Sequence, residues 1–218
     1  MLVRLVNRLM KTEFKKVLEI IKGADETLMT ARAGVEQARS LQPMKRRIGL
    51  RNAVVFGRQV SWILQNLKSV VDDFDSWYEP WQDRMKNDPA CVYLKNLRNE
   101  IEKQGKMQTA VATHVKHLDY GMLMSLVAKT KPPGATSFFV GDPYGGSGWV
   151  VPLPTGESEK FYIELPNVPG VELSIEIRFA NAPKEIQEMP AVDVCNNYIS
   201  FLTELIADAK RVFLLSPV

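Results

Sequence analysis

The stretch "YLKNLRNEIEKQGK", residues 93–106, marks the point where the character of the chain changes. Leu94, Leu97 and Ile101 recur every three or four positions, which predicts a helix with one apolar face. Gly105 is a favourable C-terminal stop for that helix. The next run, "TAVATHVKHL" (109–118), has β-branched residues at alternate positions, as is typical of a strand. We therefore expect a helical region to end at Gly105 and a β region to begin there.

Two longer apolar stripes precede this helix and predict helices over residues 12–41 and 46–86. Gly23 can bend or split the first of them. Pro80 lacks an N–H, so we expect it to bend or break the second helix near its end. The turn Asn87-Asp88-Pro89 then leads into the third helix, at about residues 90–104.

The N-terminus carries Leu2, Leu5 and Leu9, a spacing that predicts an amphipathic helical extension. Packing against the body or a partner subunit is compatible with it, and so is contact with a membrane surface. A signal peptide is not expected, because Arg4, Asn7 and Arg8 interrupt the apolar run. No membrane span is expected either, because no stretch approaches the roughly 20 apolar residues that a span needs.

The β region contains several further apolar runs after residues 109–118. They are "SFFVGD", "GWVVPL", "KFYIEL" and "VELSIEIRF", the last of which alternates between apolar and polar residues. Together the five runs predict a small antiparallel sheet. The segment "GDPYGGSG" (141–148) reads as a hairpin loop rather than a phosphate loop, because a strand and not a helix follows its glycines. "MLMSLV" (122–127) is compatible with helix or strand.

A helical period returns at about residue 190 and continues to the C-terminus. All the predicted helices have an apolar stripe to bury, so the economical solution is one up-and-down bundle. We therefore predict an α+β fold in a single domain, residues 1–218. The bundle takes residues 1–105 and 190–215, and the small antiparallel sheet is a β insertion at about 106–183, before the last helix.

Charge is distributed unevenly along the chain. Residues 1–105 carry 19 Lys and Arg against 13 Asp and Glu, whereas residues 106–218 carry 9 against 12. The segment "MKRRIGLRNAVVFGR" (44–58) is the clearest basic feature, and a solvated face balanced by nearby acids is one reading of it. Contact with a nucleic-acid backbone is the sharper reading. Its candidate residues are Lys45, Arg46, Arg47, Arg51 and Arg58.

Arg98, in the opening stretch, lies at the edge of the predicted apolar stripe. An arginine there commonly pairs with a carboxylate, but it can also grip a phosphate. The run "LRNEIEKQG" resembles the motif helix of the HEPN superfamily in its Leu-Arg-Asn start and its terminal glycine. The resemblance covers residues 12–105 and 190–215. It implies an all-α bundle, often a metal-independent ribonuclease, with the arginine at a dimer interface and Arg98 and Asn99 as its site residues here.

The chain departs from the HEPN pattern at the histidine. That residue should stand at position 103, 104 or 105, where this chain has Lys103, Gln104 and Gly105. Acid–base catalysis near neutral pH needs a group that titrates there, and a lysine on the wet face of the helix does not. We therefore expect the ribonuclease chemistry to be absent.

Other candidate sites are few. Tyr144 and Trp149, in and after the hairpin loop, are available for contact with a partner. His114 and His117 are expected on opposite faces of a strand, which is a poor metal pair. Cys91 and Cys195 form no metal-binding pattern and read as buried free thiols, which fits a cytoplasmic location. We expect no metal and no cofactor, because no motif for either is present.

Three functions remain open from the sequence. The first is a non-catalytic HEPN-like binding protein, a homodimer that binds RNA or protein in a defence, mobile-element or toxin–antitoxin setting. The second is a HEPN-type endoribonuclease that uses Arg98 with a displaced base. The third is an interaction protein that works through the β insertion. An enzyme is the less favoured class among them.

Overall fold

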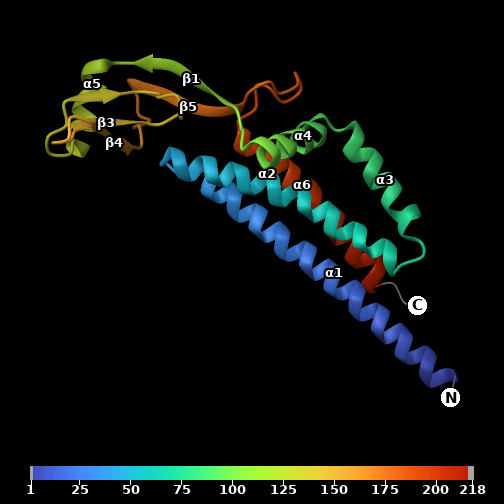
Figure 1. The fold of residues 1–218 in the computed structure, drawn as a ribbon. Helices are drawn as coiled ribbons and strands as arrows, with labels where there is room; N and C mark the ends of the chain where they lie inside the picture. The colour runs from blue at the N-terminus through green and yellow to red at the C-terminus, as the bar shows by residue number, and fades with distance from the viewer. Residues whose placement is uncertain (1, 216–218) are drawn as a thin grey trace.

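The computed structural model describes the backbone of residues 2–215 and the side chains of residues 12–215. It confirms the α+β fold, a helical bundle with antiparallel β structure inserted before the last helix. Figure 1 shows the long helices lying side by side and the β region at one end of them. The bundle helices are α1 (Leu2–Ala38), α2 (Pro43–Gln65), α3 (Phe74–Asn87), α4 (Pro89–Gln104) and α6 (Ala191–Lys210).

Helices α1 and α2 form a closely packed antiparallel pair (Figure 1). Their backbones meet at Gly34 and Gly49. A Cβ added at Gly49 would lie 2.4 Å from the nitrogen of Ala38 and 2.5 Å from the carbonyl oxygen of Gly34. Glycine is therefore required there by the helix–helix distance rather than by a turn. Gly23, which was expected to be able to bend or split this segment, lies within the continuous helix α1.

The predicted helix over residues 46–86 is wrong as a single element. Helix α2 ends at Gln65 and a short 3₁₀ turn, Asn66–Ser69, redirects the chain into α3. The turn lets the aromatic face of α3 pack back on the C-terminal part of the chain. Trp77 lies against Phe213, and the indole nitrogens of Trp77 and Trp81 donate to Asp208 at 2.8 and 3.0 Å. These tertiary contacts override the continuous helical period.

Pro80 lies inside α3 and does not end it. The carbonyl left without its N–H partner belongs to Ser76, and both residues are exposed, so water can satisfy that carbonyl. The boundaries of α4, by contrast, are as predicted. Asp88 caps its N-terminus by accepting from the backbone nitrogen of Cys91 at 2.7 Å, and Gly105 ends it in the left-handed conformation with φ 67°.

The five predicted strands are present, but they form two sheets rather than one. Strands β1 (Thr109–Leu118) and β5 (Val171–Phe179) make a two-stranded antiparallel ribbon. Strands β2 (Ser137–Phe139), β3 (Ser147–Pro152) and β4 (Ser158–Ile163) make a three-stranded antiparallel sheet. The ambiguous segment is a helix, α5 (Tyr120–Val127), followed by a 3₁₀ turn, Ala128–Thr130.

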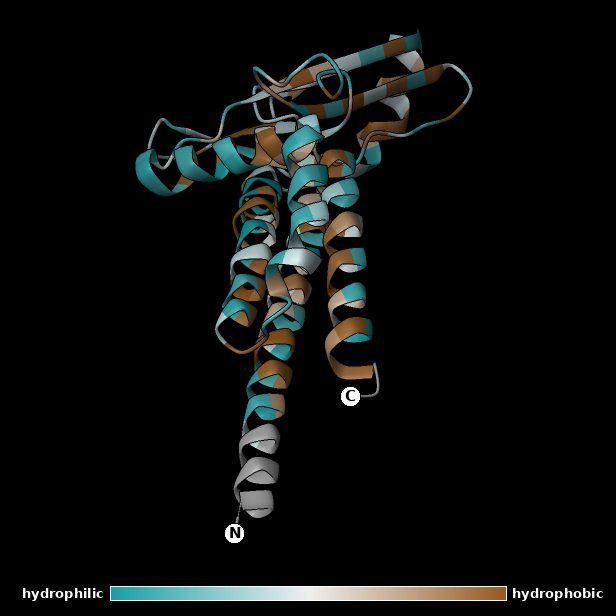
Figure 2. Cartoon of the chain, turned by 90° about the vertical axis from the view of Figure 1, so that its right-hand side faces the viewer, coloured by the Kyte–Doolittle hydropathy of each residue, from teal (hydrophilic) through white to brown (hydrophobic). Residues whose placement is uncertain are grey.

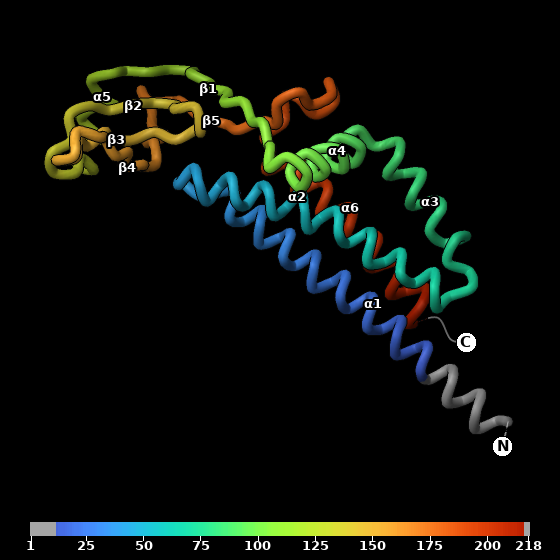
Figure 3. The backbone as a smooth tube through the Cα atoms, viewed as in Figure 1, coloured from blue at the N-terminus to red at the C-terminus, as the bar shows by residue number. Residues whose placement is uncertain are grey.

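The chain enters the insert directly from α4 through β1 and leaves it through β5 toward α6, as the trace in Figure 3 shows. In the side view of Figure 2 the insert covers one end of the bundle, and the C-terminal end of α6 lies at the other. A short π-helical segment, Arg211–Leu215, ends the described chain. None of the helices within residues 2–215 is long and apolar enough to cross a bilayer.

The insert has a small core of its own, which is separate from the core of the bundle. Its buried residues are Leu123, Val127, Ala135, Trp149, Val171 and Leu173. Trp149 is only 3% exposed and packs edge-on against Phe138, with its indole nitrogen 3.1 Å from Thr130 Oγ1. The expectation that Trp149 is available to a partner is therefore wrong, because its ring fills this small core.

Candidate functional site

Arg98 is held between the helices α2 and α4. Its guanidinium lies 4.0 Å from the centroid of the Trp62 ring on α2, and it forms an ion pair with Glu102 one turn along α4. It also donates to Asn99 Oδ1 at 3.1 Å. The Arg98 side chain is 13% exposed. Arg98 and Asn99 are thus hydrogen-bonded to each other, and Arg98 contributes to the contact between α2 and α4. Neither His114 nor His117 is among their partners.

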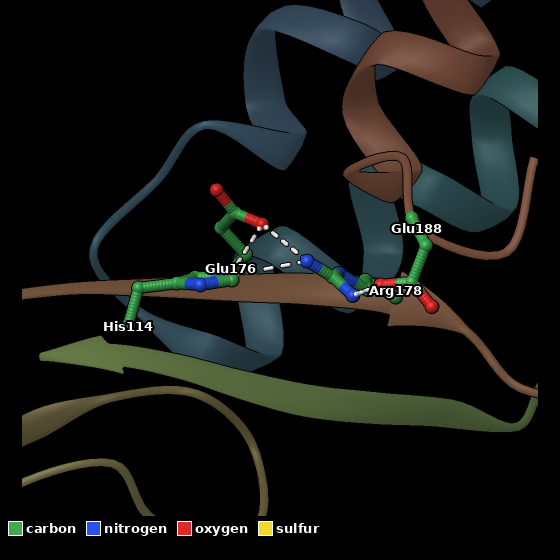
Figure 4. Close-up of polar contacts among 4 residues, drawn as sticks. All are labelled: His114, Glu176, Arg178 and Glu188. Atoms are coloured by element: carbon green, nitrogen blue, oxygen red, sulfur yellow. Dashed lines mark hydrogen bonds and ion pairs between the residues drawn. The ribbon is translucent and has the colours of Figure 1, made fainter.

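His114 lies in a different cluster, on the outer face of the β1–β5 ribbon (Figure 4). Its Nε2 is 3.2 Å from a Glu176 carboxylate oxygen and 3.1 Å from Arg178 Nη2. Arg178 also pairs with Glu188, in the segment before α6. The cluster contains two carboxylates and one guanidinium, so it has no excess positive charge when the imidazole is neutral. It is therefore better suited to joining β1, β5 and the segment before α6 than to binding a phosphate.

His117 lies beyond a register irregularity between Val115 and His117, where simple alternation of faces does not hold. It is exposed and its backbone pairs with that of Glu172. Within residues 12–215 no group of three or more His, Cys, Asp or Glu side chains is placed to hold a metal ion.

The five basic residues predicted to contact nucleic acid have different neighbours in the structure. Arg46 donates from Nε to the carbonyl of Ser40 and from Nη1 to the carbonyl of Gly145, both at 3.0 Å. Arg51 donates to the carbonyl of Gly105 at 2.8 Å. Arg58 bonds Ser61 and lies over the Trp62 ring, 4.7 Å from its centroid. Arg46 and Arg51 are thus partly occupied by structural bonds to backbone carbonyls.

None of these five cations has a carboxylate partner among the described side chains. Residues 37–71 contain seven basic residues and no acidic one. The Asp142 carboxylate of the β2–β3 loop nevertheless acts on the charge of Arg46, so the segment is balanced in part from outside itself. Lys45 is exposed and Arg47 is half-buried, and neither has a hydrogen bond or ion pair within the described chain. Their charges remain open to an anion from outside.

The loop between β2 and β3 is built around one buried carboxylate, that of Asp142. Its Oδ1 accepts from the backbone nitrogens of Tyr144 and Gly146 at 3.0 Å. Its Oδ2 accepts from Lys160 Nζ at 2.7 Å and from the Tyr162 hydroxyl at 3.0 Å. Burial acts to raise the pKa of Asp142, but these hydrogen bonds outweigh it and the pKa is lowered. A carboxylate that is ionised at neutral pH therefore fixes the loop.

Glycines bring this loop against the start of α2. A Cβ at Gly146 would lie 2.4 Å from the Tyr162 ring and 3.1 Å from Pro43 Cγ. Gly145 has φ 75° and offers its carbonyl to Arg46. Burial lowers the pKa of Arg46, and the nearby Asp142 carboxylate offsets part of that effect. The loop and the helix therefore form one joined surface.

This joined surface contains a groove of about 730 Å³, which we call the junction groove. Its lining includes two cations, three aromatic rings, a thioether and one carboxylate, from Met44, Arg47, Tyr144, Glu159, Lys160, Phe161 and Tyr162. Met44, Tyr144 and Phe161 are 69%, 55% and 50% exposed. The structure thus brings Arg47 and Tyr144 together, although they lie far apart in the sequence. Phe161 was not predicted as a site residue, because its place in the apolar run "KFYIEL" gives no sign that the ring is exposed.

Comparison with known proteins finds one family whose model matches most of the chain. The family model for bacteriophage lambda protein ea47 matches residues 35–212, which include most of the bundle and the entire insert. The chain belongs to the phage lambda ea47 family. Protein ea47 of Escherichia phage lambda is 37% identical over 67 residues, which cover 28% of this chain and 15% of that protein. No solved structure matches this ea47-family chain, so the resemblance to the HEPN superfamily stays a prediction.

Proposed function

We propose that the protein is a non-catalytic binding protein and that the junction groove binds single-stranded nucleic acid. The observation that carries this proposal is the position of Arg47, which has no ion-pair partner among the described side chains, beside the exposed rings of Tyr144 and Phe161. The exposed Lys45 lies two residues before Arg47 on α2. Proteins that bind single strands combine positive charge that follows the backbone with aromatic rings on which bases stack. Each stacked base contributes about 1–3 kcal/mol to binding.

Fluorescence anisotropy with a labelled single-stranded oligonucleotide tests the proposal. Tyr144→Ala and Arg47→Gln should each weaken binding. Two matched controls should not, namely Tyr120→Ala, an exposed ring on α5, and Lys129→Gln, an exposed cation of the insert. Two phosphate contacts, at a slope of about 0.7 each, predict a loss of about sevenfold in affinity between roughly 50 and 200 mM salt. Equal affinities of Tyr144→Ala and the wild type would refute the groove as the site.

A protein partner at the same groove is the second candidate. Leu41, Met44 and Ile48 are 46%, 69% and 42% exposed near the groove, and aliphatic side chains pack on proteins rather than stack on bases. This candidate predicts no oligonucleotide binding and capture of one partner by the wild type that Met44→Ser loses. A homodimer is proposed as well, through Phe14, Leu18 and Met29 on one face of α1, and light scattering on Leu18→Glu tests it.

The endoribonuclease alternative has less support. Arg98 is occupied by Trp62 and Glu102, and His114 by Glu176 and Arg178. Cleavage of RNA by the purified protein, and its loss in Arg98→Ala, would overturn the non-catalytic proposal.

A further inference from the structure

A second hollow lies between the helices of the bundle and is unrelated to the junction groove. Four helices contribute to it, α2, α3, α4 and α6, and its volume is about 290 Å³. We call it the interhelical pocket. That volume is close to the lower end of the ~300–1,000 Å³ typical of small-molecule sites, so the pocket has room for one small ligand and not for an oligonucleotide.

Three cations from three helices converge on the interhelical pocket, and its lining contains no carboxylate. They are Arg58 of α2, Lys86 of α3 and Lys95 of α4. Lys86 has an exposed partner, Asp83, at 3.4 Å. Lys95 has no partner among the described side chains, and the buried Nε of Arg58 has no hydrogen-bond acceptor. Two of the three cations thus have no counter-charge, and like charges brought together in this way favour an anion between them.

The remaining titratable groups of the pocket do not supply the missing negative charge. Burial, together with Asp88, raises the pKa of the Cys91 thiol to about 12. Burial likewise raises the pKa of Tyr78 and of Tyr198. All three groups are therefore neutral at physiological pH and add no negative charge to the three cations of the lining.

The pocket also offers contacts for an uncharged part of a ligand. Tyr78 and Tyr198, each 5% exposed, form its buried floor, and Met85 and Val92 add apolar wall. Gln65 donates to the Tyr78 hydroxyl at 3.1 Å, while Gln82 lines the rim without a partner in the described chain. Carboxamides of this kind both donate and accept, as the edge of a nucleobase requires.

We infer that the interhelical pocket binds a phosphate ester of mononucleotide size. Arg58, Lys86 and Lys95 hold its phosphate, and the Tyr78–Tyr198 floor with the two carboxamides receives the organic part. Gly57 makes this floor possible, because a Cβ at that position would lie 2.8 Å from the Tyr198 ring. The inference does not depend on the proposed function of the junction groove.

Isothermal titration calorimetry with adenosine monophosphate, adenosine and inorganic phosphate tests this inference. The nucleotide should bind the full-length protein and raise its Tm, inorganic phosphate should bind at least tenfold more weakly, and adenosine should give no heat. Absence of nucleotide binding would overturn the inference. Equal affinity for inorganic phosphate would overturn the assignment of an organic moiety to the pocket.

One variant and two controls locate the site. Lys95→Gln should weaken nucleotide binding at least fivefold, whereas Lys103→Gln, an equally exposed lysine two turns further along α4, should leave it unchanged. Both side chains are exposed, so the fold is not at risk. Tyr144→Ala should keep full nucleotide affinity while it loses oligonucleotide binding. Loss of nucleotide binding in Tyr144→Ala, or its retention in Lys95→Gln, would show that the ligand is bound elsewhere.

Discussion

The bundle and the insert are stabilised in opposite ways. In the bundle, the contact that sets the geometry is the very close approach of the backbones of α1 and α2 at Gly34 and Gly49. In the insert, the corresponding element is a buried charge, because Asp142 accepts four hydrogen bonds from the loop and from β4. The bundle should therefore be sensitive to added volume, and the insert to the loss of one acceptor. The junction groove lies where the bundle meets the insert.

The largest expected effect is that of Gly49→Ala. Its Cβ would meet backbone atoms of α1 at 2.4 to 2.8 Å, and backbone cannot rotate away as a side chain can. Overpacking costs about 1–3 kcal/mol in general, and we expect the upper end of that range here, or more. Urea unfolding followed by circular dichroism at 222 nm measures it.

Gly23→Ala is the matched control, because the nearest atom to its Cβ would be Ile63 Cγ2 at 3.9 Å. In a helix interior this change should stabilise the protein by about 0.5–1 kcal/mol. Unfolding of Gly49→Ala and Gly23→Ala at the same urea concentration would contradict the close contact between α1 and α2.

The next effect is that of Asp142→Asn, which should act on the insert and leave the helices intact. An asparagine cannot accept from all four donors, and an unsatisfied buried group costs about 1–3 kcal/mol. Amide hydrogen exchange should therefore accelerate at Tyr144 and Gly146, while amides of α2 stay protected. Asp119→Asn, at the cap of α5, is the control and should affect only the start of that helix. Uniform acceleration across the bundle would contradict the separation of the two regions.

Lowering the pH should destabilise both the bundle and the insert, because each contains one carboxylate with a lowered pKa. Burial acts to raise the pKa of Asp208, but hydrogen bonds from Trp81, Arg211 and Trp77 outweigh it, so its pKa is lowered, as is that of Asp142. A lowered folded pKa gives stabilisation that is complete above the ordinary carboxyl pKa of about 3.9 and is lost as the pH falls through the folded value.

The free energy of unfolding should therefore be flat near neutral pH and fall below about pH 4. Urea unfolding at a series of pH values measures this dependence, and Asp208→Asn should reduce its slope. An identical slope in Asp208→Asn and the wild type would show that other carboxyl groups carry the acid sensitivity.

An element boundary or a site could be predicted from the sequence only where the contacts that determine it are local in the sequence. The cap at Asp88 and the stop at Gly105 were predictable, because each is set by its own few residues. The break after Gln65 was not, because it follows from the packing of Trp77 and Trp81 on the distant Asp208. The junction groove was missed as a unit for the same reason. Its cation, Arg47, comes from α2, whereas its ring, Tyr144, comes from a loop whose position depends on Asp142.

The smallest predicted effect concerns Arg98, the residue in the opening stretch that resembles a catalytic motif. Its contact with the half-exposed Trp62 ring is a cation–π interaction, which contributes about 0.5–2 kcal/mol. Arg98→Ala should therefore lower the free energy of unfolding by about 1 kcal/mol. In a double-mutant cycle with Trp62→Ala the two changes should be non-additive, because each removes the same contact. Additive effects would mean that Arg98 does not serve the α2–α4 contact, which would leave its guanidinium available to a bound phosphate.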